Sequence, residues 1–279
     1  MKITLQHIEE LSEKDNSFEK FTSKKRKLSA TQNVRKLISE EGIEHGFNTA
    51  DLEELRDRGI LDDLVKIIKS GKEASVYLGR SCGEYIAVKV YTDLRVRSFR
   101  RDDMYREGRF VGDARLQKAM DQGSATGLSA RQILWVQEEF RQLYFLYNAG
   151  IPVPKPIATS GKVVLMEFIG SEGEASERLS DIHLEKDEAE EAFRQSVKIL
   201  EAIVSAGRIH GDYSAYNILW DKGRAVVIDF PQVVGITSNR SSREILLRDV
   251  NSLCKSFKRH KIYTDPEGIY KRLLRITGD

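Results

Sequence analysis

An acidic and an amide side chain stand five positions apart in the stretch HGDYSAYNILW, residues 210–220. Asp212 can accept a hydrogen bond from an attacking hydroxyl, and the amide oxygen of Asn217 is a ligand type that suits Mg²⁺. Asp229 then closes the apolar run AVVID, where a metal ion would neutralise its charge. These types and spacings favour a site that transfers a phosphoryl group. For Asp229 alone, a capping or turn aspartate is the alternative interpretation.

A phosphoryl-transfer site also needs a cation on the phosphates. Lys89 lies within IAVKVY, between apolar residues, where an unpaired ammonium group would be costly to bury. Glu139, in the next predicted helix, could pair with Lys89 and hold it for the α- and β-phosphates of a nucleotide. The alternative is a lysine on an edge strand whose ammonium group reaches solvent.

The stretch SGKEASVY, residues 70–77, is the candidate loop over the phosphates. It has one glycine and matches neither GxGxxG nor GxxxxGK[ST], so a plain hairpin turn is the alternative. Because a strand is predicted on each side, Ser70, Lys72 and Ser75 could supply donors to phosphate. In the catalytic stretch, His210 is expected to pack and hydrogen-bond the loop rather than act as a base. Ser214 would either touch phosphate or brace the turn.

The elements that must position these residues follow from hydrophobic spacing and turn residues. A helix is expected through Leu52, Leu55, Ile60, Leu61 and Leu64, with Thr49 or Asp51 as its cap. Three short antiparallel strands should follow, up to about residue 92. Further elements are a helix from Ser129 to Gly150 with Ser129 as its cap, an extended segment at IPVPKPIA, a strand in KVVLMEFIG, and a helix from Lys186 closed by Gly207.

This order predicts an α+β chain with a β-rich lobe, an apolar connecting strand and a mostly helical lobe. The predicted boundaries are a helical N-terminal extension at 1–65, a first lobe with its hinge at 66–170 and a second lobe at 171–279. The first lobe would contain a long insertion at 92–130. Ligands favour the junction of two such lobes.

Composition is that of an ordinary globular protein, with 32% charged and 40% apolar residues among 279. The sequence has neither a membrane-spanning apolar run nor a secretory signal, so a cytoplasmic location without a membrane partner is expected. Cys82 and Cys254 support neither a disulfide framework nor a zinc site.

Basic residues are concentrated in two places. Residues 95–131 hold nine Lys or Arg against five Asp or Glu, and from Arg240 onward the numbers are ten and five. Such patches attract phosphate-bearing partners, ATP or RNA among them, and a solvated charged face is the equal alternative.

Taken together, these residues make the sequence resemble the RIO family of atypical protein kinases. The matching stretches extend from about residue 66 to 255 and are SGKEASVY, IAVKVY, EEFRQL, AGIPVPKPI, LMEFIG, HGDYSAYNIL and VVIDFPQ. The resemblance implies a two-lobed protein-kinase-like fold and an Mg²⁺-ATP-dependent serine kinase or ATPase that phosphorylates itself. It also implies a switch in maturation of the small ribosomal subunit, with the pre-ribosomal particle and its rRNA as partners.

By this resemblance Lys89 binds ATP while paired with Glu139, and the backbones of Glu167 and Ile169 contact adenine. Ser70, Lys72 and Ser75 would cover the phosphates.

The same resemblance makes Asp212 the catalytic aspartate and Asn217 and Asp229 the ligands of Mg²⁺, with Mn²⁺ as a substitute. In this family the metal-binding aspartate can also become an aspartyl-phosphate, so Asp229 would be both ligand and phosphoacceptor.

Departures from ordinary protein kinases agree with this interpretation. HGD replaces HRD, DFP replaces DFG, and no APE motif follows. Only fifty residues follow Asp229, too few for both an activation loop and peptide-binding helices, so a reduced C-terminal lobe is expected. IDFPQ resembles the second RIO subfamily and the long insertion resembles the first. Serines at 98, 124 and 129 are candidate autophosphorylation sites.

Two other function classes compete. A small-molecule kinase resembling aminoglycoside phosphotransferases would also have an HGD loop and a later Asp on a strand, although GKEASVY and IDFPQ argue against it. A non-catalytic RNA-binding scaffold would retain only a vestigial nucleotide site, but every catalytic position holds a competent residue type.

Overall fold

The computed structural model describes residues 49–71, 74–91, 118 and 120–277. These residues divide into two compact units. The first holds 49–91, 118–140 and 157–168, with the gaps given above, and the second holds 141–156 and 169–277. Each is described by itself, and the lobe boundaries predicted from the sequence stay predictions.

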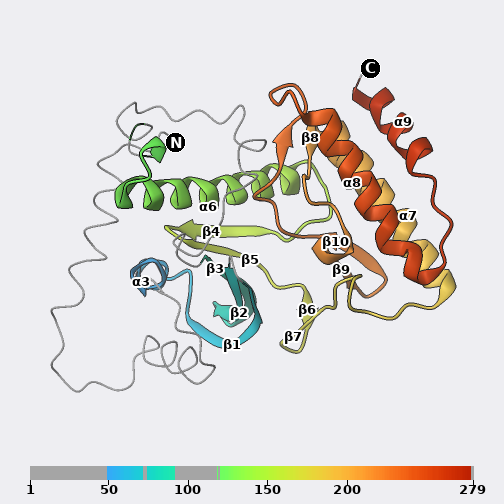
Figure 1. Ribbon diagram of the computed structural model, residues 1–279. Helices are drawn as coiled ribbons and strands as arrows, with labels where there is room; N and C mark the ends of the chain where they lie inside the picture. The colour runs from blue at the N-terminus through green and yellow to red at the C-terminus, as the bar shows by residue number, and fades with distance from the viewer. Residues whose placement is uncertain (1–48, 72–73, 92–117, 119, 278–279) are drawn as a thin grey trace, which may run out of the picture. The chain divides into compact units, whose positions relative to one another are not determined.

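A five-stranded sheet forms the first unit, with strand order β1-β2-β3-β5-β4 (Figure 1). Its strands are β1 (Asp63–Ser70), β2 (Ala74–Ser81), β3 (Glu84–Tyr91), β4 (Pro156–Ser160) and β5 (Val163–Glu167). β3 pairs antiparallel with β2 on one side and with β5 on the other. The three antiparallel strands predicted from residues 65–92 are therefore confirmed, and β3 is a central strand.

Helix α3 (Thr49–Asp57) packs its apolar residues into the core on one face of this sheet. Leu52 and Leu55 join a cluster that includes Tyr77, Val88 and Leu165. The prediction that this helix continues through Leu64 is wrong. Gly59 has a positive φ of 66°, which an α-helix does not tolerate, so Leu61 and Leu64 reach the same core from the turn and from β1.

The carboxylate of Asp51 fastens α3 to the turn between β4 and β5. It accepts the Lys162 N–H at 2.8 Å, and Glu54 accepts the Ser160 hydroxyl at 2.8 Å. Gly161 in this turn has φ +45°, and a Cβ there would lie 2.1 Å from the Asp51 carboxylate. Only glycine therefore fits this turn without displacing Asp51.

Helix α6 (Ala125–Asn148) is shared, since its residues up to Phe140 belong to the first unit and those from Arg141 to the second. The predicted start at Ser129 is wrong, because the helix begins at Ala125 and the Ser124 hydroxyl accepts the Gly127 N–H at 3.1 Å. Residues 125–130, predicted to end the insertion, thus belong to the helix. The predicted stop at Gly150, with φ +74°, is confirmed.

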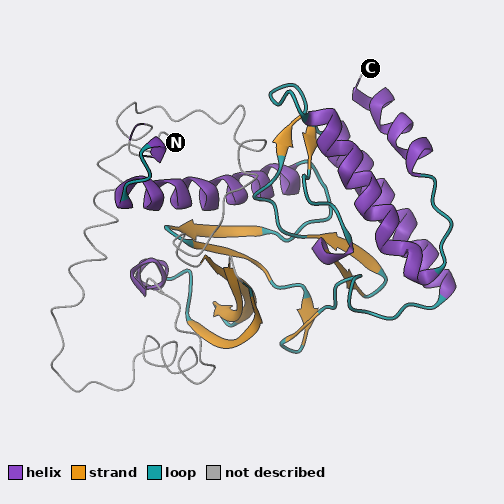
Figure 2. Ribbon diagram, in the orientation of Figure 1, coloured by secondary structure: helices purple, strands orange, loops and turns teal. Residues whose placement is uncertain are grey.

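Three helices dominate the second unit and pack on one another: α7 (Lys186–Ser205), α8 (Ser242–Phe257) and α9 (Pro266–Thr277) (Figures 1 and 2). α7 is followed by Gly207 at φ +75°, as predicted. The shorter elements are β6 (Gly170–Ser171), β7 (Glu174–Ala175), β8 (Arg208–Ile209), η3 (Ala215–Asn217), β9 (Ile218–Asp221), β10 (Arg224–Val227), β11 (Val234–Gly235) and η4 (Lys258–His260). Within the described part of the chain, no helix has the length and apolar character needed to span a bilayer.

Candidate active site

Lys89 and Glu139 form a nearly buried ion pair in the first unit. Lys89 Nζ donates to Glu139 Oε1 at 2.6 Å, and the two side chains are 12% and 1% exposed. The ammonium group also lies 5.1 Å from the centre of the Tyr91 ring. The pairing predicted from the sequence is therefore present, and the edge-strand alternative for Lys89 is wrong because β3 is flanked on both sides. The role of the pair in nucleotide binding stays a prediction.

Strand register decides which neighbours share a face with Lys89. Val76 and Val164 stand directly opposite it on the adjacent strands, so their side chains lie on its face. Ser75 stands opposite Val90, on the other face, and is 4% exposed. The candidate donor Ser75 thus points away from the face that carries Lys89.

The candidate phosphate loop is the tip of the β1–β2 hairpin. The Gly71 N–H donates to the Ala74 carbonyl at 3.1 Å, and the hydroxyls of Ser70 and Ser75 lie 3.3 Å apart. Ser70 is exposed at this tip. Lys72, the third predicted donor, lies outside the described residues.

The two predicted adenine contacts follow one another at the end of β5. Glu167 is the last residue of that strand, with an exposed side chain. The Ile169 carbonyl accepts the Ser176 N–H at 3.0 Å, which leaves its N–H as the better group to offer adenine. These backbone contacts stay predictions.

In the second unit, the side chain of Asn217 makes two hydrogen bonds to Asp212. Its Nδ2 donates to the Asp212 main-chain oxygen and to Asp212 Oδ2, both at 2.9 Å. Since the amide nitrogen is committed to Asp212, Oδ1 is the end of Asn217 that can face a cation. The Ile228 N–H donates to the Asn217 carbonyl at 2.9 Å, which ties this loop to the segment that carries Asp229.

Asp229 adopts a left-handed backbone conformation, with φ +72°. This conformation costs a non-glycine residue about 1 kcal/mol or more, and such strain concentrates at functional sites. Phe230, the next residue, is fully buried and anchors the segment.

Partial desolvation and the charge of Asp229 raise the pKa of Asp212, while its hydrogen bond from Asn217 and the charge of Arg248 act in the opposite direction. Because Asp212 is exposed by surface area, the proximity of Asp229 is the more important of these two causes.

These side chains fit a divalent cation, because two carboxylates that repel each other would be relieved by a positive ion between them. Mg²⁺ commonly takes few protein ligands and completes its shell with water and phosphate oxygens. Among the described residues, no group of three or more His, Cys, Asp or Glu side chains is arranged to hold a metal. The assignment of Asn217 and Asp229 as protein ligands stays a prediction.

Asp249 on α8 holds the loop that carries Asp212, and this residue was not predicted from the sequence. Its carboxylate is 1% exposed and accepts the Gly211 N–H at 2.8 Å and the Tyr213 N–H at 3.1 Å. Burial raises the pKa of Asp249 to about 7, against the effect of the two N–H donors. Arg248 Nη2 donates to the Gly211 carbonyl at 2.7 Å. The sequence feature that could have identified Asp249 is an acidic residue among the residues that form the buried face of an amphipathic helix.

His210 is a neutral packing residue, as expected. It is fully buried, and burial lowers its pKa to about 4 against the charge of Asp229. Its Nδ1 accepts the Asp212 N–H at 3.4 Å, and its ring packs edge-on against Tyr213 and Phe230. The Ser214 carbonyl accepts the Asn217 N–H at 2.9 Å, and the role of the Ser214 hydroxyl stays a prediction.

A profile of the RIO domain matches residues 75–269. The RIO-type serine/threonine-protein kinase Rio1 of Haloferax volcanii is 34% identical over 79% of this chain and 71% of its own length. The Methanocaldococcus jannaschii protein of the same name is 32% identical over 78% and 70%. The human serine/threonine-protein kinase RIO1 is 30% identical over 74% of this chain, but only 35% of the human protein is covered.

The fold is that of solved RIO structures. Two crystal structures of the Rio2 kinase from Chaetomium thermophilum, one described as an ADP/Mg²⁺-phosphoaspartate complex, match with a TM-score of 0.62 at 22% identity. Each match covers 83% of this chain, and it covers 66% of the Rio2 chain in the ADP/Mg²⁺-phosphoaspartate complex and 68% of the Rio2 chain in the other structure. These structures confirm the expected α+β kinase-like fold, and the RIO-domain match with the Rio1 relatives confirms the expected phosphotransferase class. The chain belongs to the RIO family of atypical serine/threonine protein kinases.

Proposed function

We propose that this chain is an Mg²⁺-ATP-dependent serine kinase and ATPase whose site is built from Lys89, Asp212, Asn217 and Asp229. The observation that carries the proposal is the pair of hydrogen bonds from Asn217 to Asp212, with the charge of Asp229 close enough to raise the pKa of Asp212. Metal-assisted phosphoryl transfer needs oxygen ligands for the metal ion and a carboxylate that can reach the attacking hydroxyl. The amide nitrogen of Asn217 is bonded to Asp212, so its oxygen can face the metal ion, and Asp229 is a second acid nearby. Asp212 is the exposed acid that can meet the hydroxyl.

Each residue then has a distinct role. Lys89, held by Glu139, binds the α- and β-phosphates of the nucleotide. Asn217 and Asp229 would hold Mg²⁺, which when bound would offset the negative charge of the phosphates. Asp212 accepts the proton of the attacking serine hydroxyl. His210 takes no proton, since its lowered pKa keeps it neutral at physiological pH.

Asp229 would also accept phosphate in the ATPase reaction. A carboxylate oxygen attacks the γ-phosphorus, the bond from that phosphorus to the bridging oxygen breaks, and ADP leaves. Water then releases inorganic phosphate and regenerates the carboxylate. The strained φ of Asp229 and the phosphoaspartate in the similar Rio2 structure support this proposal.

Phosphate release from Mg²⁺-ATP and incorporation of labelled phosphate into the chain test the proposed function. Asp229→Ala should abolish both, and Asp212→Asn should lower serine phosphorylation by at least about 100-fold, the usual range for a lost general base. Asp187→Asn, in the exposed first turn of α7, is the matched control and should keep both activities. Undiminished phosphate release by Asp229→Ala would contradict the proposal.

We further propose that the partner is a maturing small ribosomal subunit in the cytoplasm, and that the chain binds its rRNA. Family membership supports the partner, and the excess of basic residues from Arg240 onward supports contact with RNA. Binding to an rRNA fragment should weaken steeply between 50 and 200 mM salt, by roughly 10³-fold for about six phosphate contacts. Affinity that does not change with salt would overturn the rRNA proposal and leave the ATPase proposal intact.

A further inference from the structure

Two tyrosines belong to the loop that carries Asp212, and their rings lie in different environments. Tyr213 is fully buried, and its hydroxyl donates to the Ser196 carbonyl at 2.7 Å. Tyr216 is 62% exposed and directly precedes Asn217 in the sequence. Tyr213 therefore stabilises the core, whereas Tyr216 places an aromatic ring in solvent beside a proposed metal ligand.

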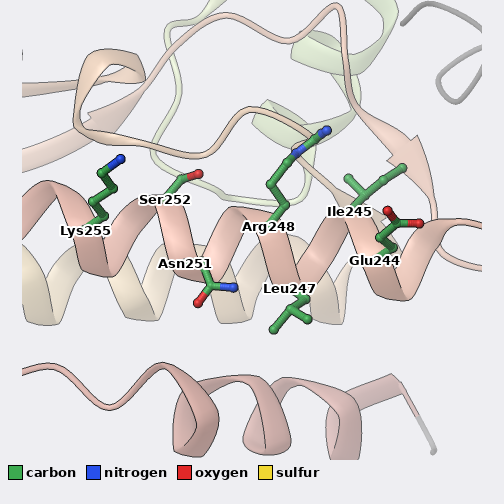
Figure 3. A pocket seen from close by; sticks show the side chains of 7 residues that line it. All are labelled: Glu244, Ile245, Leu247, Arg248, Asn251, Ser252 and Lys255. Atoms are coloured by element: carbon green, nitrogen blue, oxygen red, sulfur yellow. The ribbon is translucent and has the colours of Figure 1, made fainter.

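Helix α8 holds the backbone of this loop at two further points. The Ala215 N–H donates to the Ser256 hydroxyl at 3.2 Å. Arg248, which Figure 3 shows projecting from α8, donates to the Gly211 carbonyl at 2.7 Å. The Tyr216 ring is therefore carried by a backbone segment that is held in place before any substrate binds, which lowers the entropy cost of a contact with the ring.

The segment that leads into α7 lies against the same loop and gives the ring a charged neighbour. The Ser180 N–H donates to the Ala215 carbonyl at 3.0 Å, and the Arg178 guanidinium lies 5.9 Å from the centre of the Tyr216 ring. Arg178 also pairs with Asp181 at 2.7 Å. Because the charge of Arg178 is already paired, the exposed surface of the ring is what this part of the loop offers to a partner.

Tyr216 lies within reach of the residues that flank a serine at Asp212. Asn217 Nδ2 is 2.9 Å from Asp212 Oδ2. Given the length of the Asn217 side chain and about 3.8 Å between adjacent Cα atoms, the Tyr216 Cα lies within about 10 Å of that carboxylate oxygen. Side chains two positions apart in an extended peptide point the same way and are separated by about 6.6 Å. A peptide whose serine hydroxyl meets Asp212 therefore turns the side chains two positions away toward the same loop.

We propose that Tyr216 is a specificity-determining residue for serine phosphorylation, and that its ring packs against an apolar side chain two positions from the phosphorylated serine. This inference rests on the proposed function, because it takes Asp212 as the acceptor of the serine proton. Packing of an apolar side chain on the ring removes hydrophobic surface of both partners from water. A basic side chain gains less, since the ring already has the Arg178 guanidinium beside it.

A nucleobase, the other aromatic partner that an exposed tyrosine can stack on, fits this position less well. Proteins that bind single-stranded RNA combine such stacking with cations along the phosphate backbone. Here the neighbouring cation, Arg178, is paired with Asp181, and the exposed carboxylate of Asp212 would repel phosphates. The charges around the Tyr216 ring therefore favour a protein segment over RNA.

The test is phosphorylation of synthetic peptides Gly-Ala-X-Ala-Ser-Ala-X-Ala-Gly, in which X is Phe, Ala or Lys, with labelled ATP and Mg²⁺. Because X stands two positions from the serine on both sides, the direction in which the peptide binds does not affect the result. The expected kcat/KM of the Phe peptide is at least ten times that of the Ala peptide and exceeds that of the Lys peptide. A chain that releases phosphate from ATP but phosphorylates none of the peptides, or prefers the Lys peptide, would overturn the inference and leave the ATPase proposal intact.

Variants assign the preference to Tyr216. Tyr216→Ala should reduce the ratio of kcat/KM between the Phe and Ala peptides from at least ten to below two, and Tyr216→Phe should keep it above five. Because both peptides are measured on the same variant, a loss of active protein cancels in this ratio. Tyr263→Ala, which removes a 90% exposed tyrosine between η4 and α9, is the matched control and should keep the ratio. An unchanged ratio in Tyr216→Ala, or a short single-stranded RNA that inhibits the unaltered chain but not Tyr216→Ala, would overturn the proposal.

Discussion

The ion pair between Lys89 and Glu139 shows at the scale of single residues what a buried charge requires. Both groups are removed from water, and their attraction offsets the cost only while both are present. A pair of apolar residues would fill the same space at less cost. The presence of this buried pair, with Lys89 on a central strand and Glu139 on α6, therefore agrees with a role for Lys89 beyond stability.

Replacing one partner of this pair should cost more than replacing both. Lys89→Met leaves the Glu139 carboxylate buried and should lower the free energy of unfolding by about 3–5 kcal/mol. The double variant Lys89→Met with Glu139→Leu should recover most of that loss in urea unfolding, while nucleotide binding stays absent. A double variant no more stable than Lys89→Met would contradict this account.

Stability below neutral pH should depend on His210. Its pKa is about 4 in the folded state and about 6.5 unfolded, so the unfolded chain binds the extra proton between these values. Stability is therefore lost as pH falls through this window, by up to about 3 kcal/mol from this group. His210→Gln should reduce the fall in unfolding free energy between pH 6.5 and 4.5 measured in urea. A fall as large as that of the unaltered chain would show that His210 is not responsible.

At the scale of elements, α8 holds the loop that carries Asp212 through Asp249, whose carboxylate accepts two loop N–H groups. Asp249→Asn keeps the shape but replaces one acceptor with a donor, so one loop N–H should lose its bond. We expect kcat for ATP turnover to fall at least tenfold, with KM for ATP changed less than threefold.

Asp265→Asn is the matched control for this prediction, because Asp265 also accepts an N–H, that of Gly268 at 3.0 Å, at the exposed start of α9. It should leave both kinetic constants within a factor of two. A rise in KM without a fall in kcat for Asp249→Asn would assign Asp249 to nucleotide binding instead of loop positioning.

The turn between β4 and β5 should tolerate no side chain. Gly161→Ala combines a positive φ with a Cβ 2.1 Å from the Asp51 carboxylate and should lower unfolding free energy by more than about 2 kcal/mol. Gly223→Ala has a positive φ of 78° but open space around it, and should cost only about 1 kcal/mol. Equal costs in urea unfolding would show that Asp51 moves freely.

Elements with a strong local signal were predictable from the sequence. Strand β3 alternates in burial over most of its length, and glycines with positive φ follow α6 and α7 at the predicted helix ends. The start of α6 and the end of α3 were not predictable from the sequence. The serines near the start of α6 and the leucines near the end of α3 each fit more than one boundary. Which serine caps α6 is decided by a single hydrogen bond to Ser124.

The residues of the candidate site likewise separate into those that were predictable from the sequence and those that were not. Lys89 and Glu139 were linked from the sequence because a buried cation demands an anion. Asp249 was missed because its partners are backbone N–H groups, and backbone groups leave no sign in a sequence. The face occupied by Ser75 depends on strand register, which residue spacing alone does not determine.

At the scale of the whole molecule, the chain divides into two units that carry different functional side chains. The first holds a cation on a sheet, and the second holds the acid and amide side chains of a loop. The proposed function requires both sets, since a cation on the phosphates and oxygen ligands for a metal ion are both needed to activate a nucleoside triphosphate. The account therefore depends on both sets acting on one Mg²⁺-ATP.

A crystal structure with Mg²⁺ and a non-hydrolysable ATP analogue measures this directly. The account predicts Lys89 Nζ within about 3 Å of an α- or β-phosphate oxygen. It also predicts Asn217 Oδ1 and an Asp229 oxygen about 2.1 Å from the same Mg²⁺. A nucleotide bound by one unit alone, or a metal ion coordinated without Asp229, would contradict it.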